Sequence, residues 1–267
     1  MYVFQHNQLL LFLVLLIAGS TAYALGIHWL RFYQPPRRAV WLFLILVVPL
    51  GIVAAHVAFA LINSRSPAAW PAFFLSVQGW RSGYASIGGA AAALLALALT
   101  ALIQRHRIVP LLDQFAPLAF ITIAMLRVVC LVNGCCHGRP TDLPWAMRFP
   151  SAGLPEGLTP PSHPAQLYAI AANLLIYLLL PQLIKRLGWR AGSGVLALAC
   201  LALYSLQRSA VEFLRLGATS QVACCGLSLT QLILLPAAVV AITGIVVLSR
   251  AEARRPASDD DESTESN

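Results

Sequence analysis

Two arginines stand out in this sequence because they interrupt or follow long apolar stretches. Arg127 lies between the apolar runs at residues 118–125 and 128–132, and Arg208 follows another run at residues 192–206. An ionisable side chain at membrane depth is costly and usually marks a functional site. A guanidinium group is a rigid fork of donors that suits phosphate, and lipid head groups carry phosphate at that depth. The two arginines therefore predict a phosphate site, although Arg127 could instead extend to the membrane surface.

Polar residues recur at helical spacing around Arg208. Tyr204, Arg208, Glu212 and Arg215 are separated by four, four and three residues, so a helix would carry them along one face. A simple alternative is a structural ion pair between Arg208 and Glu212 alone. We favour a shared cluster, because Arg127 is expected at the same membrane face and precedes a polar, turn-rich stretch at residues 133–141.

The composition indicates which elements must position these residues. Hydrophobic residues make up 59% of the chain and charged residues 10%, which leaves too little polar surface for a soluble globule. Seven apolar runs approach the roughly 20 residues that cross a hydrocarbon core. They lie near residues 9–30, 39–62, 85–103, 116–132, 165–184, 192–206 and 227–248. Backbone groups in lipid must be satisfied within each segment, so we predict an all-α, polytopic membrane protein with about seven transmembrane helices.

The orientation follows from the distribution of Lys and Arg between the alternating loops. Eleven of these residues fall on one side and six on the other, and the richer side should be the cytoplasm. This places the N-terminus outside, the C-terminus in the cytoplasm, and the loops at residues 63–84, 133–164 and 208–226 on the outer face. The net charge of +8 is explained by this topology, so we expect no nucleic-acid partner.

The two ends of the chain differ in character. The first apolar run could be a cleaved signal peptide, but only His6 could carry positive charge before it, so we expect an uncleaved helix. Residues 258–267 are acidic and lack apolar side chains, which predicts a disordered cytoplasmic tail. We therefore expect one transmembrane helical domain over residues 1–257, followed by the tail at 258–267.

Two cysteine pairs fall on predicted outer loops, where disulfides persist. The pairs are Cys135–Cys136 and Cys224–Cys225, and three interpretations stay open: a disulfide between the loops, a metal site made by the four thiols, and inert thiols. Cys200 lies inside an apolar run and is interpreted as a small core residue.

Several ordered motifs resemble one family, the bacterial prolipoprotein diacylglyceryl transferases, over nearly the whole chain. The motifs are Asp113 with Ala116-Pro117; Arg127, Asn133, Gly134 and Gly138; residues 140–145 and 149–150; His163-Pro164-Ala165-Gln166-Leu167-Tyr168; Tyr204, Arg208 and Glu212-Phe213-Leu214-Arg215; and residues 227–231. The cysteines make the chain similar to a divergent, cysteine-bearing branch of that family.

The resemblance implies a multi-pass enzyme of the bacterial plasma (inner) membrane. Such an enzyme transfers the diacylglyceryl group of phosphatidylglycerol to the lipobox cysteine in the signal peptide of a preprolipoprotein, and its partners are these substrates and membrane lipid. The implied catalytic residues are Arg127, Arg208, Glu212 and Tyr204. The implied substrate-binding residues are Arg127, Asn133, Gly134, Gly138, His163 and Gln166. By this reading the arginines stabilise charge on the departing phosphate, Glu212 orients Arg208, and neither a metal nor another cofactor is needed.

The chain departs from the family pattern at several positions. Ile87 stands where the family carries a histidine, Val53 replaces an arginine, Ser162 replaces an arginine, Ala169 replaces a glutamate, and Cys130 and Cys135 replace asparagine and glutamate. The acid–base group is therefore unassigned among His56, His137, Tyr204 and Glu212. Two other functions stay open: a non-catalytic lipid-binding or transport protein on the same scaffold, and a thiol redox protein.

Overall fold

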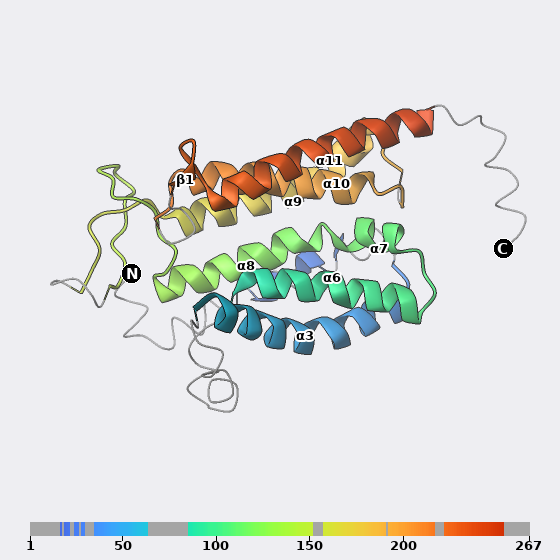
Figure 1. Ribbon diagram of the computed structural model, residues 1–267, viewed down its shortest axis with the longest axis horizontal. Helices are drawn as coiled ribbons and strands as arrows, with labels where there is room; N and C mark the ends of the chain where they lie inside the picture. Colours follow the sequence, from blue (N-terminus) through green and yellow to red (C-terminus); the bar gives the residue numbers. More distant parts are fainter. Residues whose placement is uncertain are drawn as a thin grey trace, which may run out of the picture. The chain divides into compact units, whose positions relative to one another are not determined.

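Figure 1 shows the computed structural model of the 267-residue chain. The structure describes residues 35–63, 85–151, 157–190, 192–216 and 222–253, together with 17, 19–21, 24–26, 28 and 29. Most of the first apolar run and all of the acidic tail therefore lie outside the described residues. The chain divides into two compact units, Met1–Phe32 with Asp113–Asn267, and Tyr33–Leu112.

Two apolar helices pack together in the unit formed by Tyr33–Leu112. These are α3 (Arg37–Asn63) and α6 (Ser86–Ile103). A Cβ atom on Gly88 would lie 2.1 Å from the backbone oxygen of Ala54, so glycine is what allows the two helices to approach this closely. His56 is fully buried in this unit, whereas Ile87 is 67% exposed.

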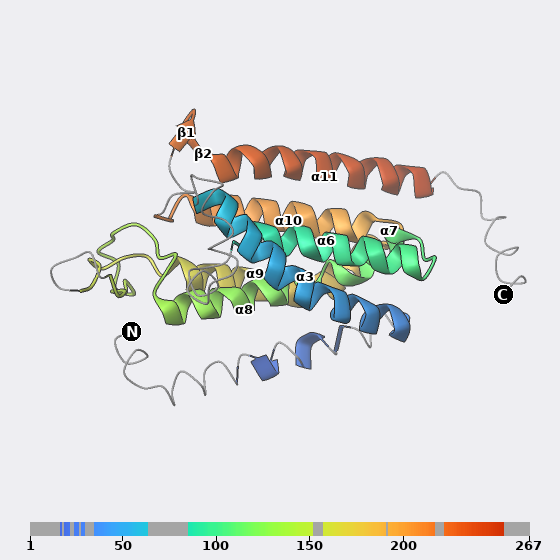
Figure 2. The same cartoon turned by 60° about the horizontal axis from the view of Figure 1, so that its bottom comes forward.

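The other unit contains the helices that carry the arginines. They are α7 (Ile108–Phe115), which crosses the boundary between the units, α8 (Leu118–Asn133), α9 (Ala165–Leu187), α10 (Val195–Glu212) and α11 (Leu229–Ala253). α9 contacts both α8 and α10, and α11 runs along α10 in both ribbon views (Figures 1 and 2). A short antiparallel hairpin of β1 (Val222–Cys224) and β2 (Leu227–Ser228), with Val222 opposite Ser228, precedes α11.

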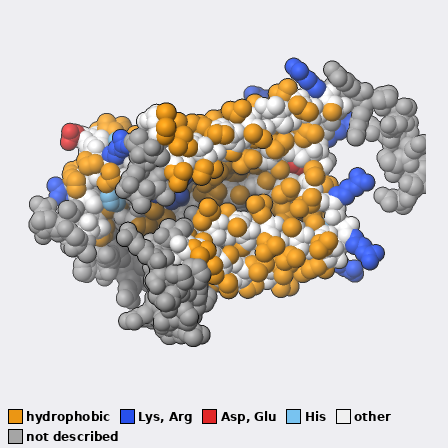
Figure 3. All heavy atoms as spheres, in the orientation of Figure 1, with side chains coloured by type: hydrophobic (Ala, Val, Ile, Leu, Met, Phe, Trp, Pro, Cys, Tyr) orange, Lys and Arg blue, Asp and Glu red, His pale blue; other side chains and the backbone are white. Residues whose placement is uncertain are grey.

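The helices have the length and surface expected of membrane spans. Four described helices can each cross a bilayer, α3, α9, α10 and α11, and the pair α7–α8, bent by 44° at Pro117, gives a fifth if it acts as one span. α6 is apolar but shorter. Side chains such as Trp41 and Ile45 of α3 and Val240 of α11 are about two-thirds exposed, and hydrophobic side chains cover the flanks of the described helices in Figure 3. The prediction of a helical, polytopic membrane protein is thus confirmed, while the count of seven spans and the orientation stay predictions.

Two polar residues from the recognised motifs fix the ends of helices. The carboxylate of Asp113 accepts hydrogen bonds from the backbone N–H groups of Gly194 and Ala197, both at 2.8 Å, and so caps the start of α10. At the start of α11, the Gln231 side chain accepts from the Ser228 N–H and the Ser228 hydroxyl accepts from the Gln231 N–H, which is a capping box. Gln231 also donates to the Ser209 carbonyl at 3.1 Å, which ties α11 to α10.

Candidate functional site

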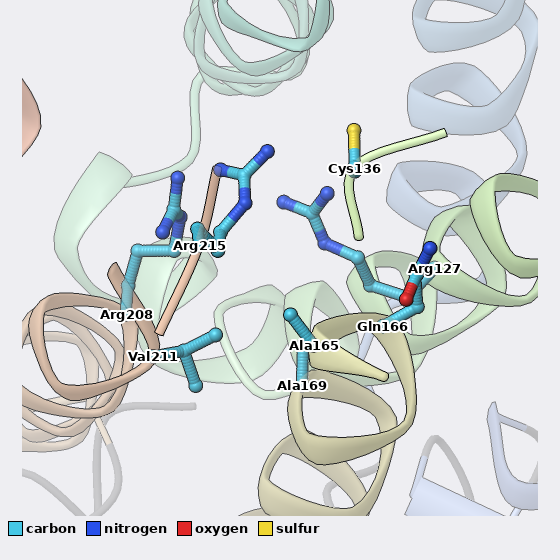
Figure 4. Close-up of a pocket in the computed structure, with 8 residues that line it drawn as sticks. All are labelled: Arg127, Cys136, Ala165, Gln166, Ala169, Arg208, Val211 and Arg215. Atoms are coloured by element: carbon cyan, nitrogen blue, oxygen red, sulfur yellow. The ribbon is translucent and has the colours of Figure 1, made fainter. Parts of the chain in front are cut away.

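A small cavity lies where α8, α9 and α10 approach one another. It is lined by Arg127, Cys136, Ala165, Gln166, Ala169, Arg208, Val211 and Arg215 and has a volume of about 10 Å³. The guanidinium groups of Arg127 and Arg215 point toward each other across it (Figure 4). Arginines from two different helices therefore converge on one site, as the sequence predicted for Arg127 and Arg208.

Glu212 is the carboxylate that balances part of this charge. It is 2% exposed and forms ion pairs with Arg208 and, at 3.4 Å, with Arg215. Arg127 has no carboxylate partner among the described residues. In the part of the chain that the structure describes, the cavity thus brings together three guanidinium groups, of which two share one carboxylate, and it is a candidate for binding an anion.

The loop between α8 and α9 positions Arg215. Gly138 forms an antiparallel bridge with Arg215, the Arg139 N–H donates to the Leu214 carbonyl at 2.8 Å, and the Leu216 N–H donates to the His137 carbonyl at 3.3 Å. A Cβ atom on Gly138 would lie 2.5 Å from both the Leu214 oxygen and the His163 Cβ. Only glycine fits at this crossing, so its role is to bring the loop against the end of α10.

Gln166 links the same loop to the first turn of α9. Its Nε2 donates to the Cys135 carbonyl at 2.6 Å, and the residue is 1% exposed. The Oε1 atom is buried and has no hydrogen-bond partner among the described residues. Gln166 therefore brings an acceptor that is still unused to the wall of an otherwise basic cavity.

The remaining residues of the His163–Tyr168 motif stabilise the loop. The Trp145 indole donates to the Tyr168 hydroxyl at 2.7 Å, and that hydroxyl lies 3.2 Å from the His163 Nδ1. The Gly138 N–H donates to the His163 carbonyl at 2.8 Å. His137 stacks on Phe149 with ring centroids 5.2 Å apart. In these contacts both histidines pack within the loop, and neither lines the cavity.

Three cysteines gather at the same end of α8. The sulfur atoms of Cys130, Cys135 and Cys136 all lie within 4.8 Å of one another. Hydrogen bonds from the thiols of Cys130 and Cys135, with the nearby charges of Arg215 and Arg127, hold the pKa of Cys136 well below its usual range. Hydrogen bonds to Cys130 and Cys136 raise the pKa of Cys135. A thiolate at Cys136 is therefore favoured beside the arginines.

The second cysteine pair does not belong to this cluster. The Cys224 and Cys225 sulfur atoms, in the exposed hairpin before α11, are 3.1 Å from each other. All six cysteines are free, so of the three interpretations that the sequence left open, the structure does not contain the disulfide between the two loops. Cys135 and Cys136 instead lie beside Cys130.

The predicted site residues divide into three groups. Arg127, Arg208 and Gln166 line the cavity, and Glu212 holds two of its arginines. Tyr204 lies one turn before Arg208 on α10, half-buried, and does not line the cavity. Asn133, Gly134, Gly138 and His163 also do not line it; Gly134, at φ +70°, ends α8 and packs against Pro150.

The sequence predicted a catalytic or binding role for neither of two polar lining residues, Arg215 and Cys136, although it placed Arg215 in the cluster around Arg208. Both carried a signal in the sequence. Arg215 continues the helical spacing of Arg208 and Glu212, and Cys136 lies in the turn-rich stretch that follows Arg127.

The fold and the cavity together define a helical, multi-pass membrane protein with an arginine-lined cavity between its helices. The chain belongs to the prolipoprotein diacylglyceryl transferase family, whose model matches residues 8–247. The resemblance inferred from the motifs is thus confirmed.

Curated relatives carry the name phosphatidylglycerol–prolipoprotein diacylglyceryl transferase. That of Methylococcus capsulatus is 36% identical over 182 residues, covering 67% of this chain and 65% of the relative. That of Pasteurella multocida is 34% identical over 149 residues, covering 54% and 50% respectively. That of Cereibacter sphaeroides is 30% identical over 179 residues, covering 60% and 61%. The matched part of this chain spans less than two thirds of the length of each of these relatives.

Proposed function

We propose that this protein transfers the diacylglyceryl group of phosphatidylglycerol to the lipobox cysteine thiol of preprolipoproteins and releases glycerol 1-phosphate. The observation that carries the proposal is the convergence of Arg127, Arg208 and Arg215 on one cavity in a chain of this family. Guanidinium groups bind phosphate and stabilise the charge that develops on it as it leaves. The relatives' printed names support the choice of both substrates.

The cavity must open for a head group to enter. Its volume of about 10 Å³ holds roughly one water molecule, so a phosphate would have to separate the guanidinium groups of Arg127 and Arg215. Arg208 is held by Glu212, whereas Arg127 has no described carboxylate to leave. Arg127 is therefore the arginine best placed to move onto an incoming phosphate.

Gln166 supports the choice of a head group that carries hydroxyls. Its buried Oε1 accepts no hydrogen bond from the described residues, and an unsatisfied buried acceptor is costly. The glycerol head group of phosphatidylglycerol carries hydroxyl donors beside its phosphate. One such hydroxyl would satisfy Gln166 while the arginines hold the phosphate.

The finer topology forms part of the proposal. We infer seven spans in the bacterial inner membrane, with the N-terminus outside, the C-terminus inside, and the cavity at the outer face. The basic residues at the ends of α9 and α11, Lys185, Arg186 and Arg250, support this orientation. An alkaline phosphatase fused to the C-terminus should be inactive, because that enzyme works only outside the cytoplasm. An active C-terminal fusion would overturn the topology.

A reconstituted transfer assay tests the activity. The full chain in liposomes of phosphatidylglycerol is given a lipobox peptide, and both the peptide mass and the released glycerol phosphate are measured. Arg127→Ala and Arg208→Ala should each lower the rate about 100-fold or more, since each removes a donor to the developing charge. Arg250→Ala is the matched control, because Arg250 is exposed in the last turn of α11 and should leave the rate unchanged.

The outcomes separate the competing functions. Transfer at the parental rate by either cavity variant would refute the mechanism. Lipid binding without any release of glycerol phosphate by the parental chain would favour a non-catalytic lipid-binding or transport protein. Loss of transfer on Cys224→Ser and Cys225→Ser would favour a thiol redox function, since these cysteines do not line the cavity. The variant Ile87→Ala should transfer lipid at nearly the parental rate, because the Ile87 side chain offers no acid–base group.

A further inference from the structure

The cluster of Cys130, Cys135 and Cys136 is built by the way α8 ends. The helix stops at Gly134, and the Cys135 N–H donates to the Cys130 carbonyl at 3.1 Å. Cys136 then adopts φ +63°, a left-handed conformation that is strained for a residue with a Cβ. This turn folds both loop cysteines back over the last turns of the helix. Strain of this kind is usually retained where it serves a function.

The spacing of the three sulfur atoms suits a tetrahedral zinc ion. A Zn–S bond of about 2.3 Å requires sulfur atoms roughly 3.8 Å apart in a tetrahedron. The observed sulfur atoms lie within 4.8 Å of one another, so small side-chain rotations would bring them onto one ion. An all-thiolate set selects soft, thiolate-preferring metals, of which Zn²⁺ has no redox chemistry.

The number of ligands distinguishes the kind of zinc site. Structural zinc sites use four protein ligands, whereas catalytic sites use three and keep the fourth position for a substrate or water. No fourth His, Cys, Asp or Glu joins the three cysteines among the residues that the structure describes. Cys136 also lines the arginine cavity. Three ligands beside the proposed substrate cavity are the pattern of an open, reactive site.

We propose that Cys130, Cys135 and Cys136 bind one Zn²⁺ and that its fourth position takes the acceptor thiol of the transfer reaction. The second half of this inference rests on the proposed function. It would give the chain a means to activate the thiol although Ile87 stands where the family carries a histidine. It also departs from the expectation, drawn from the family resemblance, that no metal is needed.

The chemistry balances without an oxidant or a further reactant. A thiol that coordinates zinc releases its proton to solvent and stays a thiolate nucleophile at neutral pH. Its sulfur forms a bond to the glyceryl carbon of phosphatidylglycerol, and the bond from that carbon to the phosphate oxygen breaks. The electron pair leaves on the phosphate as glycerol 1-phosphate, and the thioether product is released.

The surrounding charges favour such a site. Four thiolates around Zn²⁺ carry two excess negative charges. The cavity that Cys136 lines also contains the guanidinium groups of Arg127 and Arg215 (Figure 4). These cations would compensate the zinc–thiolate group before reaction and the phosphate afterwards.

Metal analysis of the full chain in detergent tests the site independently of transfer. After loading with Zn²⁺ and removal of excess, the parental protein should retain about one zinc per chain. Cys130→Ser, Cys135→Ser and Cys136→Ser should each weaken zinc binding by about 100-fold or more, because loss of even an outer-shell partner costs up to that much. The double variant Cys224→Ser/Cys225→Ser is the matched control and should retain the metal. A parental protein that retains no zinc, or a control that loses it equally, would overturn the inference.

Cobalt then tests the fourth ligand. The absorption spectrum of the Co²⁺-loaded protein should change on addition of a lipobox peptide with Cys but not with Ser at the acceptor position. Equal spectra would overturn the assignment of the acceptor thiol. Metal-free parental protein that transfers lipid at the zinc-loaded rate would also overturn it, while leaving the proposed function intact. Zinc binding with the peptide-dependent spectrum but without transfer would instead sink the proposed function and support the site.

Discussion

Glu212→Gln removes the charge that holds two arginines of the cavity while preserving the size of the side chain. In the parental protein Glu212 forms ion pairs with Arg208 and Arg215, the latter at 3.4 Å. The side chains of both arginines are only about a tenth exposed, at 10% and 11%, and that of Glu212 is 1% exposed. The substitution therefore leaves two desolvated guanidinium groups without their shared counter-charge.

The magnitude follows from this burial. Two unit charges 4 Å apart interact by about 4 kcal/mol at the effective dielectric constant of a partly buried site. Removing one partner of a buried ion pair costs about 3–5 kcal/mol in folded-state stability. At about 2–4 °C per kcal/mol, the Tm of Glu212→Gln should fall by roughly 10 °C.

Thermal unfolding in detergent measures this loss of stability. Repeating the measurement with added phosphatidylglycerol tests whether the lipid binds at the arginines. The phosphate of the lipid would replace the missing carboxylate, so added phosphatidylglycerol should raise the Tm of Glu212→Gln more than that of the parental protein. In the double variant Glu212→Gln/Arg215→Gln, the loss should be smaller than the sum of the single losses by about 0.5–3 kcal/mol, since the two residues are in contact. A Tm within error of the parental value, or additive losses, would refute the electrostatic account of the cavity.

Three further substitutions test the supporting structure. Gly138→Ala should lower the free energy of unfolding by about 1–3 kcal/mol, and with it the Tm, because the new Cβ would collide with His163. In the control Gly51→Ala, the new Cβ would meet no atom within 4 Å, so the Tm should be unchanged or slightly higher. Asp113→Asn should lower the free energy of unfolding by about 1 kcal/mol. It should also speed hydrogen exchange in the first turn of α10, because the N–H groups there lose a charged acceptor. Gln231→Ala should lower the free energy of unfolding by about 1 kcal/mol and speed hydrogen exchange in the first turn of α11. Unchanged hydrogen exchange in that turn would show that the capping box does not stabilise the helix.

Most of the described helices could be predicted from apolar runs, because backbone groups in lipid have no alternative to the helix. The run at residues 39–62 became α3 (Arg37–Asn63), and the run at residues 165–184 became α9 (Ala165–Leu187). The helix predicted from the run at residues 192–206 was too short at its C-terminal end, since α10 continues to Glu212. Apolarity stops before Arg208, but the ion pair to Glu212 lets the helix carry both charges further.

The bend that precedes the fourth run could not be seen from apolarity alone. The run at residues 116–132 corresponds to the single helix α8 (Leu118–Asn133), whereas the preceding helix α7 (Ile108–Phe115) was not predicted and meets α8 at 44°. Pro117 is the local cause, since it cannot donate the backbone hydrogen bond that would continue a helix from α7. The motif Ala116-Pro117 was noted for its resemblance, and its physical role is this break.

The candidate site was only partly predictable, because spacing describes contacts within a helix and not between helices. The pair Arg208–Glu212 follows from a separation of four residues. The cluster of Cys130 with Cys135 does not, because it depends on the left-handed turn at Gly134 and Cys136. The composition of residues 133–141 indicated a turn but not its left-handed geometry, so the sequence could not choose between a disulfide, a metal site and inert thiols.

The helix ends explain how the fold tolerates so much positive charge before a lipid arrives. Arg208 lies one turn before the C-terminal end of α10, at Glu212, and Arg215 lies three residues beyond it, so both are near the negative end of the helix dipole. Ala165 and Gln166, in contrast, bring the positive N-terminal end of α9 to the same cavity. A phosphate between them would therefore meet guanidinium groups on one side and a helix N-terminus on the other. Both attract an anion, so under the proposed function we expect a head group with a net negative charge to fit this cavity better than a zwitterionic one.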